Sequence, residues 1–109
     1  YISRAHVHFS MENFQEASID SSKAIELDPD DADLYIDRGL DKDQLKDTEG
    51  AIADYTKAIE LKPDSTEAYV LRGIIKENLG DLIAACADYR KAASLGDPDS
   101  AEWVRDQCN

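Results

Sequence analysis

Long apolar runs are absent from this sequence, and basic residues are scarce. No stretch approaches the roughly 18 apolar residues that a membrane span needs, and the chain does not open with the basic and then apolar segments of a signal peptide. We therefore expect no membrane insertion and a cytoplasmic location. There are 12 Lys and Arg residues against 24 Asp and Glu residues, which gives a formal net charge of −12 at pH 7. Such a charge repels nucleic-acid backbones and anionic lipid surfaces, so neither is an expected partner.

Cysteine is also rare, since the chain holds only Cys86 and Cys108. Their spacing matches no metal-ligand motif. Cys86 lies on an apolar helical stripe with Leu82, Ala85 and Tyr89, where a free thiol packs as a small apolar side chain. A disulfide between the two cysteines would need an oxidising compartment and the close approach of two helices. Because nothing in the sequence calls for either, we expect two free cysteines.

The sequence contains no constellation of catalytic or metal-binding residues. His6 and His8 are two residues apart, so a helix would direct them to different faces. The glycines are isolated, as turn and packing glycines are, and they form no phosphate-binding loop. The acidic residues lack calcium-loop spacing, and Asp28-Pro29-Asp30-Asp31 is better explained as a turn followed by a helix cap. We therefore expect no catalysis, no cofactor and no metal site.

What the sequence does contain is a repeat. The stretch KAIELDP at 23–29 returns as KAIELKP at 57–63, and an altered copy follows at 91–98. Aromatic and small residues recur 34 positions apart in phase with it: Tyr1, Tyr35, Tyr69 and Trp103; Ala5, Gly39 and Gly73; Ala17, Ala51 and Ala85; Ala24, Ala58 and Ala92. Several independent columns with one period indicate stacked structural units.

Each unit is predicted to be a pair of helices. In the second unit, apolar residues of 32–40 and of 51–61 recur at spacings of three and four, as on one face of a helix. Asp47-Thr48-Glu49-Gly50, between these stretches, has the residues of a turn and a helix start. Pro29 and Pro63 follow apolar runs that they cannot extend, and the Asp and Ser residues after them can cap the next helix. Gly or Ala on the first helix, opposite Ala on the second, would let the two backbones approach closely.

This pattern resembles the tetratricopeptide repeat, a 34-residue helix-turn-helix with aromatic, Gly/Ala, Ala, Ala and Pro columns. Arg38-Gly39 and the segment 51–63 are similar in particular to bacterial and archaeal members of the family. The resemblance covers the whole chain and implies an all-α, right-handed superhelix that forms one domain. Because the chain opens inside a repeat, we expect further sequence upstream. The expected units are repeats at about 1–30, 31–64 and 65–97, and a capping helix at about 98–107.

The resemblance also implies a function, because such repeats bind a peptide or a partner helix on a concave surface formed mainly by the first helix of each pair. In this chain that surface would place an apolar strip beside carboxylates. We therefore expect a noncatalytic interaction module whose protein or peptide partner carries an apolar anchor flanked by Lys or Arg. Trp103, on the capping helix, is expected in the core. The predicted groove residues are His6, Phe9, Asp33, Ile36, Asp37, Leu40, Asp43, Gln44, Glu67, Val70, Leu71, Ile74, Glu77 and Asn78.

One activity of the family is disfavoured on electrostatic grounds. Its co-chaperone members grip the acidic C-termini of heat-shock chaperones with Lys, Asn and Arg side chains. The corresponding positions here carry no fixed positive charge, so an acidic C-terminus would be repelled. These positions are Ile2, His6, Asp37, Glu67 and Leu71.

Two other interpretations stay open. The acidic face could serve only solvation, since Asp33, Asp37 and Asp41 form a like-charge i, i+4 ladder whose repulsion costs helix stability. Alternatively, the repeats could act as a spacer, or form a homo-oligomer through the edge of a terminal repeat. Three cations on the same helix could offset the repulsion in the acidic ladder: Arg38, Lys42 and Lys46.

Overall fold

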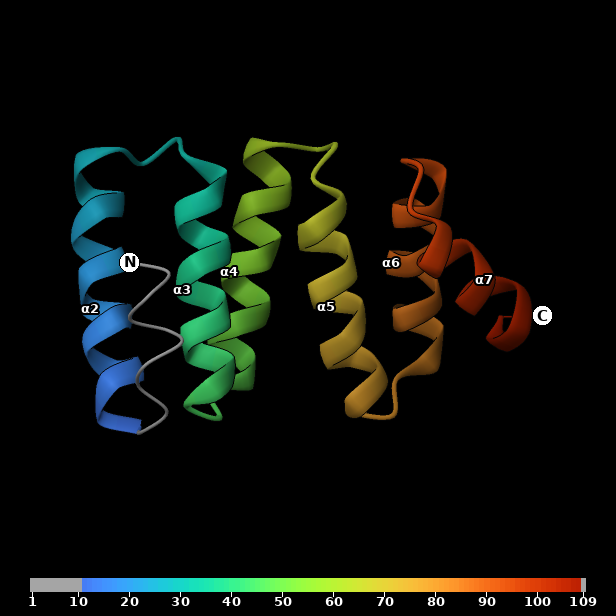
Figure 1. Ribbon diagram of the computed structural model, residues 1–109, viewed down its shortest axis with the longest axis horizontal. Helices are drawn as coiled ribbons and strands as arrows, with labels where there is room; N and C mark the ends of the chain where they lie inside the picture. Colours follow the sequence, from blue (N-terminus) through green and yellow to red (C-terminus); the bar gives the residue numbers. More distant parts are fainter. Residues whose placement is uncertain (1–10, 109) are drawn as a thin grey trace.

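The computed structural model describes residues 11–108, with side chains from residue 16 onward. Over this range the chain forms six α-helices and no β-strand. The helices stand side by side in chain order, and each packs on the helices that precede and follow it (Figure 1). Their bounds are α2 Met11–Leu27, α3 Ala32–Gln44, α4 Thr48–Leu61, α5 Thr66–Asn78, α6 Leu82–Ser94 and α7 Pro98–Gln107.

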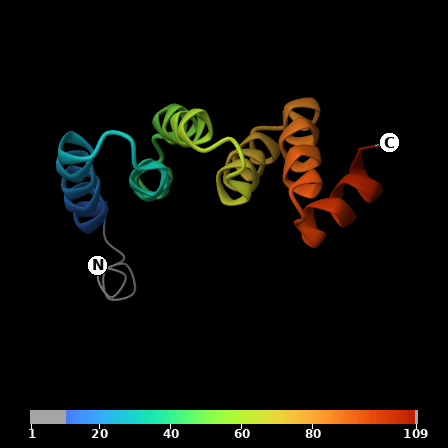
Figure 2. The same cartoon turned by 90° about the horizontal axis from the view of Figure 1, so that it is seen from above.

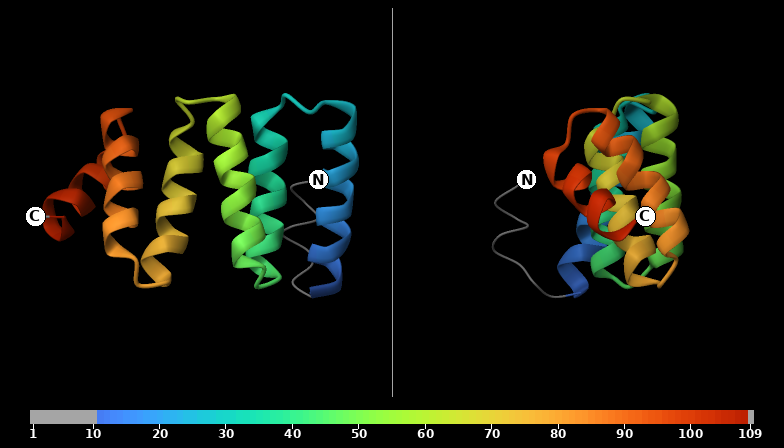
Figure 3. Two further views of the ribbon diagram at one scale, coloured as in Figure 1. Left: turned by 180° about the vertical axis from the view of Figure 1, so that it is seen from behind. Right: turned by 90° about the vertical axis from the view of Figure 1, so that its right-hand side faces the viewer.

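The row of helices has two sides. Seen from above, α3, α5 and α7 lie on one side, and α4 and α6 lie on the other (Figure 2). The view from behind shows the same order, and the end-on view shows α7 crossing the end of the row (Figure 3). Because extensive contacts join only consecutive helices, the core consists of thin layers between neighbours rather than one centre.

Capping side chains begin each helix from α3 to α7. Each accepts a hydrogen bond from a backbone N–H two or three residues further on, which satisfies one of the unpaired donors of the first turn. The helix starts predicted after Pro29 and at 47–50 are therefore observed. The capping residues and their donors are Asp31 with Asp33, Asp47 with Gly50, Ser65 with Ala68, Asp81 with Ala84, and Asp97 with Ser100.

Small residues mark the places where paired helices meet. Ala51, Ala58, Ala85 and Ala92 are all 0% exposed. Gly39 differs from the expectation that it faces an alanine, because a Cβ atom placed on it would lie 2.6 Å from Cε1 of a tyrosine on α4. That tyrosine, Tyr55, is 1% exposed, and Gly73 faces Tyr89 in the same way. The glycines thus make room for the aromatic ring of the second helix.

The structure contradicts the prediction of two free cysteines. Cys86 and Cys108 form a disulfide, with their Cα atoms 5.9 Å apart. Cys108 is the C-terminal cap of α7, and α7 lies across α6, which carries Cys86. Arg90 of α6 also donates a hydrogen bond of 2.8 Å to the carbonyl of Cys108. The prediction failed because the two cysteines are 22 residues apart, and only the direction of α7 brings them together.

None of the helices in residues 11–108 is long and apolar enough to cross a bilayer. The expected cytoplasmic location stays a prediction. The disulfide gives a reason to test it, because such bonds persist mainly in oxidising compartments.

Candidate functional site

A largely buried ion-pair network joins α5 to α6, and an equivalent network joins α3 to α4. Arg72 of α5 donates two hydrogen bonds to Asp88 of α6, one of 2.9 Å from Nε and one of 2.7 Å from Nη2. Lys76 Nζ lies 3.3 Å from the same carboxylate, which is 4% exposed. This two-point geometry is the strongest that a guanidinium and a carboxylate can form. The same contacts recur 34 residues earlier, in Arg38, Lys42 and Asp54.

Each arginine also reaches the helix pair that precedes it. Nη1 of Arg72 donates a hydrogen bond of 3.0 Å to the hydroxyl of Thr56 on α4, and Nη1 of Arg38 donates one of 3.2 Å to Ser22 on α2. Both guanidinium groups lie over the ring of the tyrosine three residues before them, 5.6 to 5.8 Å from its centroid. The hydrogen bonds to the aspartates raise the pKa of both arginines, so they stay charged. Each arginine thus joins three consecutive helices.

This network corrects the expected role of the α3 cations. Arg38 and Lys42 pair with Asp54 on α4, 16 and 12 residues further along the chain, rather than only screening the acidic ladder of their own helix. Sequence reasoning missed the network. The signal was available, because the arginines, the lysines and their aspartates each recur at the same spacing of 34 residues.

Eight of the fourteen predicted groove residues line three hollows among the described residues. The largest, which we call the α5–α7 cleft, has a volume of about 560 Å³ and contains Glu67, Val70, Leu71 and Ile74. It is lined further by Thr66, Tyr89, Asp97, Asp99, Ser100 and Trp103. None of these six further residues was among the predicted site residues.

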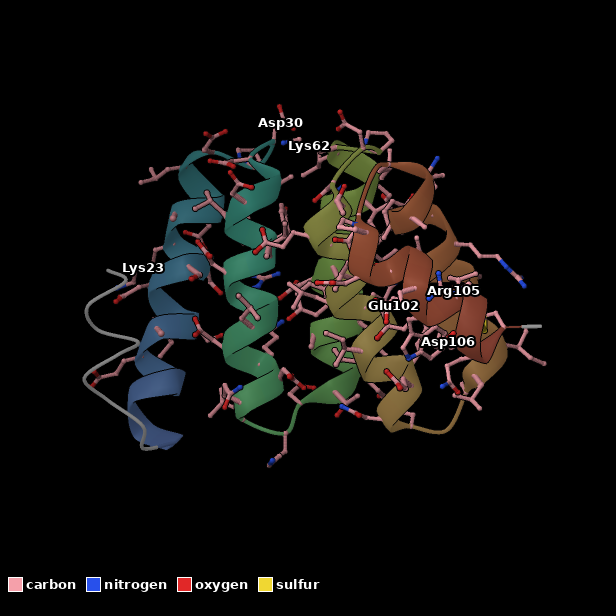
Figure 4. The ribbon with its side chains drawn as sticks, turned by 45° about the vertical axis from the view of Figure 1, so that its right-hand side comes forward. Lys23, Asp30, Lys62, Glu102, Arg105 and Asp106 are labelled. Atoms are coloured by element: carbon pink, nitrogen blue, oxygen red, sulfur yellow. A yellow bond between two sulfur atoms is a disulfide. The ribbon has the colours of Figure 1, made fainter. Side chains whose placement is uncertain are left out.

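The other two hollows lie at opposite ends of the helices. One, of about 270 Å³, includes Asp43, Gln44 and Asn78, near the ends of α3 and α5. The other, of about 410 Å³, includes Asp33 and lies between the turn that follows α2 and the end of α4. Asp30 and Lys62, which are labelled in Figure 4, line its two sides. No group of three His, Cys, Asp or Glu residues suited to a metal ion occurs in the part of the chain that the structure describes.

The predicted apolar strip is only partly a surface feature. Ile36 is 3% exposed and belongs to the core, so its assignment to the groove is wrong. The reason is its position one helical turn after Ala32, on the face of α3 that packs against the core. Leu40 and Ile74, by contrast, are 36% and 41% exposed, and Val70 is partly exposed.

Glu77 has a structural role that the sequence did not predict, and Trp103 is only partly in the core, where it was expected. The two carboxylate oxygens of Glu77 accept hydrogen bonds from the Tyr89 hydroxyl, at 3.0 Å, and from Trp103 Nε1, at 3.2 Å. Trp103 packs on Tyr89, with 4.3 Å between the ring centroids, but it is also partly exposed in the cleft. Glu77 therefore ties α5 to both α6 and α7. Among the other predicted residues, Asp37 is partly exposed, while His6 and Phe9 lie outside the described residues.

A sequence profile described as the tetratricopeptide repeat (TPR) matches residues 5–72, and a second profile of that description matches residues 66–101. This chain belongs to the tetratricopeptide repeat family. The match confirms the predicted resemblance. No curated protein matches the chain.

Several solved structures share the fold. A structure described as the first TPR of Spaghetti (RPAP3) bound to the HSP90 peptide SRMEEVD has a TM-score of 0.78 and 25% identity, over 89% of this chain and 80% of that one. The Arabidopsis OM64 TPR domain has a TM-score of 0.79 and 25% identity, over 89% and 82% of the two chains. MamA, at 24% identity, has a TM-score of 0.73 over 77% of this chain and 49% of its own. The predicted all-α TPR solenoid is thus confirmed.

Proposed function

We propose that this TPR domain is a noncatalytic scaffold that binds a basic, partly apolar segment of a protein partner on the side formed by α3 and α5. The observation that carries the proposal is the exposure of two large aliphatic side chains at one register position. Leu40 on α3 and Ile74 on α5 are 34 residues apart and are 36% and 41% exposed. Because Ile36 and Ile75 of the same two helices are buried in the core, this repeated exposure favours a role at an interface.

The distribution of charge favours a basic partner. The four cations of α3 and α5 are Arg38, Lys42, Arg72 and Lys76, and all four pair with buried aspartates of α4 and α6. The carboxylates of α3 and α5 include Asp33, Asp37, Asp43 and Glu67, which are exposed or partly exposed. A surface of this kind attracts Lys and Arg side chains and disfavours acidic ligands.

The family and its solved relatives support peptide binding in general. The Spaghetti TPR is described as bound to a peptide, SRMEEVD, that has three acidic residues and one basic residue. We propose that this chain prefers basic peptides instead. Its net charge is −12, and the cations of α3 and α5 already pair with aspartates of the fold.

A peptide array tests the proposal. Basic amphipathic peptides and acidic C-terminal peptides, SRMEEVD among them, are compared at low and moderate salt. We expect capture of basic peptides that weakens as salt increases, and its loss in the double variant Asp37→Lys with Glu67→Lys. The matched control, Glu60→Lys with Asp64→Lys, makes the same charge change at exposed sites at the end of α4 and in the turn after it. Circular dichroism checks that both variants fold. Equal capture by wild type and the Asp37/Glu67 variant would exclude this surface.

A second candidate function is self-association. Leu79, Leu82 and Ile83 are 62%, 50% and 87% exposed around the turn between α5 and α6. Such a group of apolar side chains favours contact with another copy of the chain. Analytical ultracentrifugation tests it: a mass that rises with concentration and falls in Ile83→Lys would support it, and a monomer at high concentration would exclude it.

A further inference from the structure

We propose that the α5–α7 cleft is a subsite for one large apolar side chain of the partner, next to a Lys or Arg of the same segment. The C-terminal helix then forms a wall of the binding site in addition to covering the last repeat. This inference rests on the proposed function and specifies where the apolar anchor of the ligand binds.

The cleft has an apolar interior built from three helices. Val70, Leu71 and Ile74 come from α5, Tyr89 from α6 and Trp103 from α7. Its volume of about 560 Å³ lies within the range of roughly 300–1,000 Å³ that is usual for ligand pockets. Rigid aromatic rings beside aliphatic side chains are typical of the pockets that hold anchor residues at protein interfaces.

The cleft lies where α7 follows the last helix pair, and α7 departs from the repeat spacing. In the preceding layer, Ile36 occupies the column of Val70, and it is 3% exposed within the core. One repeat length after the start of α5 at Thr66 would place the next helix start at Ser100, but α7 begins at Pro98. In the last layer Val70 is partly exposed and lines the cleft. The same column is thus buried in one layer and open in the next.

The rim of the cleft is negative. Glu67 and Asp99 are exposed in the first turns of α5 and α7, and Asp97 caps α7 through hydrogen bonds from the backbone N–H and the hydroxyl of Ser100. Each helix N-terminus contributes roughly half a positive charge, so about two of the three negative charges stay uncompensated. No Lys or Arg is among the described residues that line the cleft. Charge complementarity therefore selects a cation beside the apolar anchor.

The walls of the cleft are held in place before any ligand binds. Glu77 accepts hydrogen bonds from Tyr89 and Trp103, and the two rings pack on each other. The disulfide between Cys86 and Cys108 ties the far end of α7 to α6. A preformed pocket of this kind avoids much of the ordering cost of binding.

Trp103 is the only tryptophan of the chain, so its fluorescence reports on the cleft directly. The probes are three synthetic peptides of equal length: leucine flanked by lysines, serine flanked by lysines, and leucine flanked by glutamates. We expect the leucine–lysine peptide to bind roughly tenfold more tightly than the serine–lysine peptide and to change the Trp103 emission, since burying a leucine side chain contributes a factor of at least this size. The leucine–glutamate peptide should not bind.

Two pairs of variants separate the cleft from the rest of the surface. Ile74→Ser should remove the advantage of leucine over serine, whereas Ile83→Ser, on the exposed face of α6, should not. Asp99→Lys should weaken binding of both lysine peptides, whereas Asp106→Lys, near the end of α7 and labelled in Figure 4, should have a smaller effect.

The outcomes distinguish this inference from the proposed function. Equal binding of the two lysine peptides, or unchanged leucine preference in Ile74→Ser, would overturn the subsite and leave the basic-peptide surface intact. Binding of the leucine–glutamate peptide as tightly as the leucine–lysine peptide would overturn the charge selection by the rim. Absence of any binding to wild type would overturn both proposals.

Discussion

The guanidinium of Arg72 and the carboxylate of Asp88 form a two-point pair in which the side chains are only 17% and 4% exposed. Arg38 and Asp54 repeat it one unit earlier, with the same two distances of 2.9 and 2.7 Å. A buried carboxylate is tolerated only when it is paired and hydrogen-bonded. The stability of each of these two helix pairs therefore depends on one buried aspartate.

Replacing this aspartate should destabilise the fold. Asp88→Ala leaves Arg72 and Lys76 without their buried partner, and we expect the free energy of unfolding to fall by about 3 kcal/mol. Glu60→Ala, which breaks an exposed contact of 4.0 Å with Lys57, should cost less than about 0.5 kcal/mol. Urea denaturation measures both. A similar, small effect of the two substitutions would mean that the buried pair adds no more than a surface pair.

Alanine substitution of the two packing glycines should have unequal effects. A Cβ on Gly39 would lie 2.6 Å from the ring of Tyr55, which is only 1% exposed, whereas the nearest ring atoms to a Cβ on Gly73 are 3.2 Å away. We expect Gly39→Ala to lower the free energy of unfolding by about 2 kcal/mol. Gly73→Ala should stay within about 1 kcal/mol of wild type, because the higher helix propensity of alanine offsets the tighter contact. Thermal unfolding measures the stability of both variants. Equal losses of stability in the two variants would contradict the prediction.

Loss of the disulfide should loosen α7. Because Cys86 and Cys108 are 22 positions apart in the sequence, chain entropy predicts a stabilisation of about 3 kcal/mol, which Cys108→Ser or a reducing agent removes. We expect a lower melting temperature and a shift of Trp103 emission to longer wavelength, as the indole becomes more exposed to water. Reducing agent should change wild type but not Cys108→Ser. An unchanged emission spectrum would show that packing on Tyr89 alone holds α7.

The domain should lose stability at alkaline pH. Burial raises the pKa of Tyr55 above its ordinary value, and for Tyr89 burial acts together with the hydrogen bond to Glu77. The folded state therefore keeps these protons when the unfolded chain releases them, near pH 10. The stabilisation is fully present below that pH and is lost as the pH rises beyond it.

The tyrosine contribution can be isolated with phenylalanine variants. We expect the free energy of unfolding to fall less steeply between pH 9 and about pH 11 in Tyr55→Phe and Tyr89→Phe than in wild type, since phenylalanine has no proton to release. Parallel curves for wild type and both variants would assign the alkaline loss to other groups.

Much of the fold could be predicted from the sequence because its signals are local or periodic. Helix faces follow from spacings of three and four, and caps such as Asp31 and Ser65 act within three residues of their own position. The columns of Ala51 with Ala85 and Ala58 with Ala92 identify residues that are fully buried. The period of 34 extends these local rules to the whole stack.

The candidate site was predicted less well, because the exposure of a side chain depends on which neighbouring helix packs against it. Ile36 and Val70 share one column, yet Ile36 is buried and Val70 lines a cleft. The next helix on the same side of the row is α5 for Ile36 and α7 for Val70. A column in the sequence cannot distinguish these two environments.

The sequence by itself therefore determined the helix pairs, their caps, their buried small residues and the stacking of one unit on the next. Only the tertiary structure decided the path of α7, and with it the Cys86–Cys108 disulfide, the packing of Trp103 on Tyr89 and the open cleft. The physical reason is the distance along the chain over which the deciding interactions act. Helix formation and pair packing depend on residues a few turns apart and repeat identically, whereas the direction of the last helix depends on contacts that occur once in the chain.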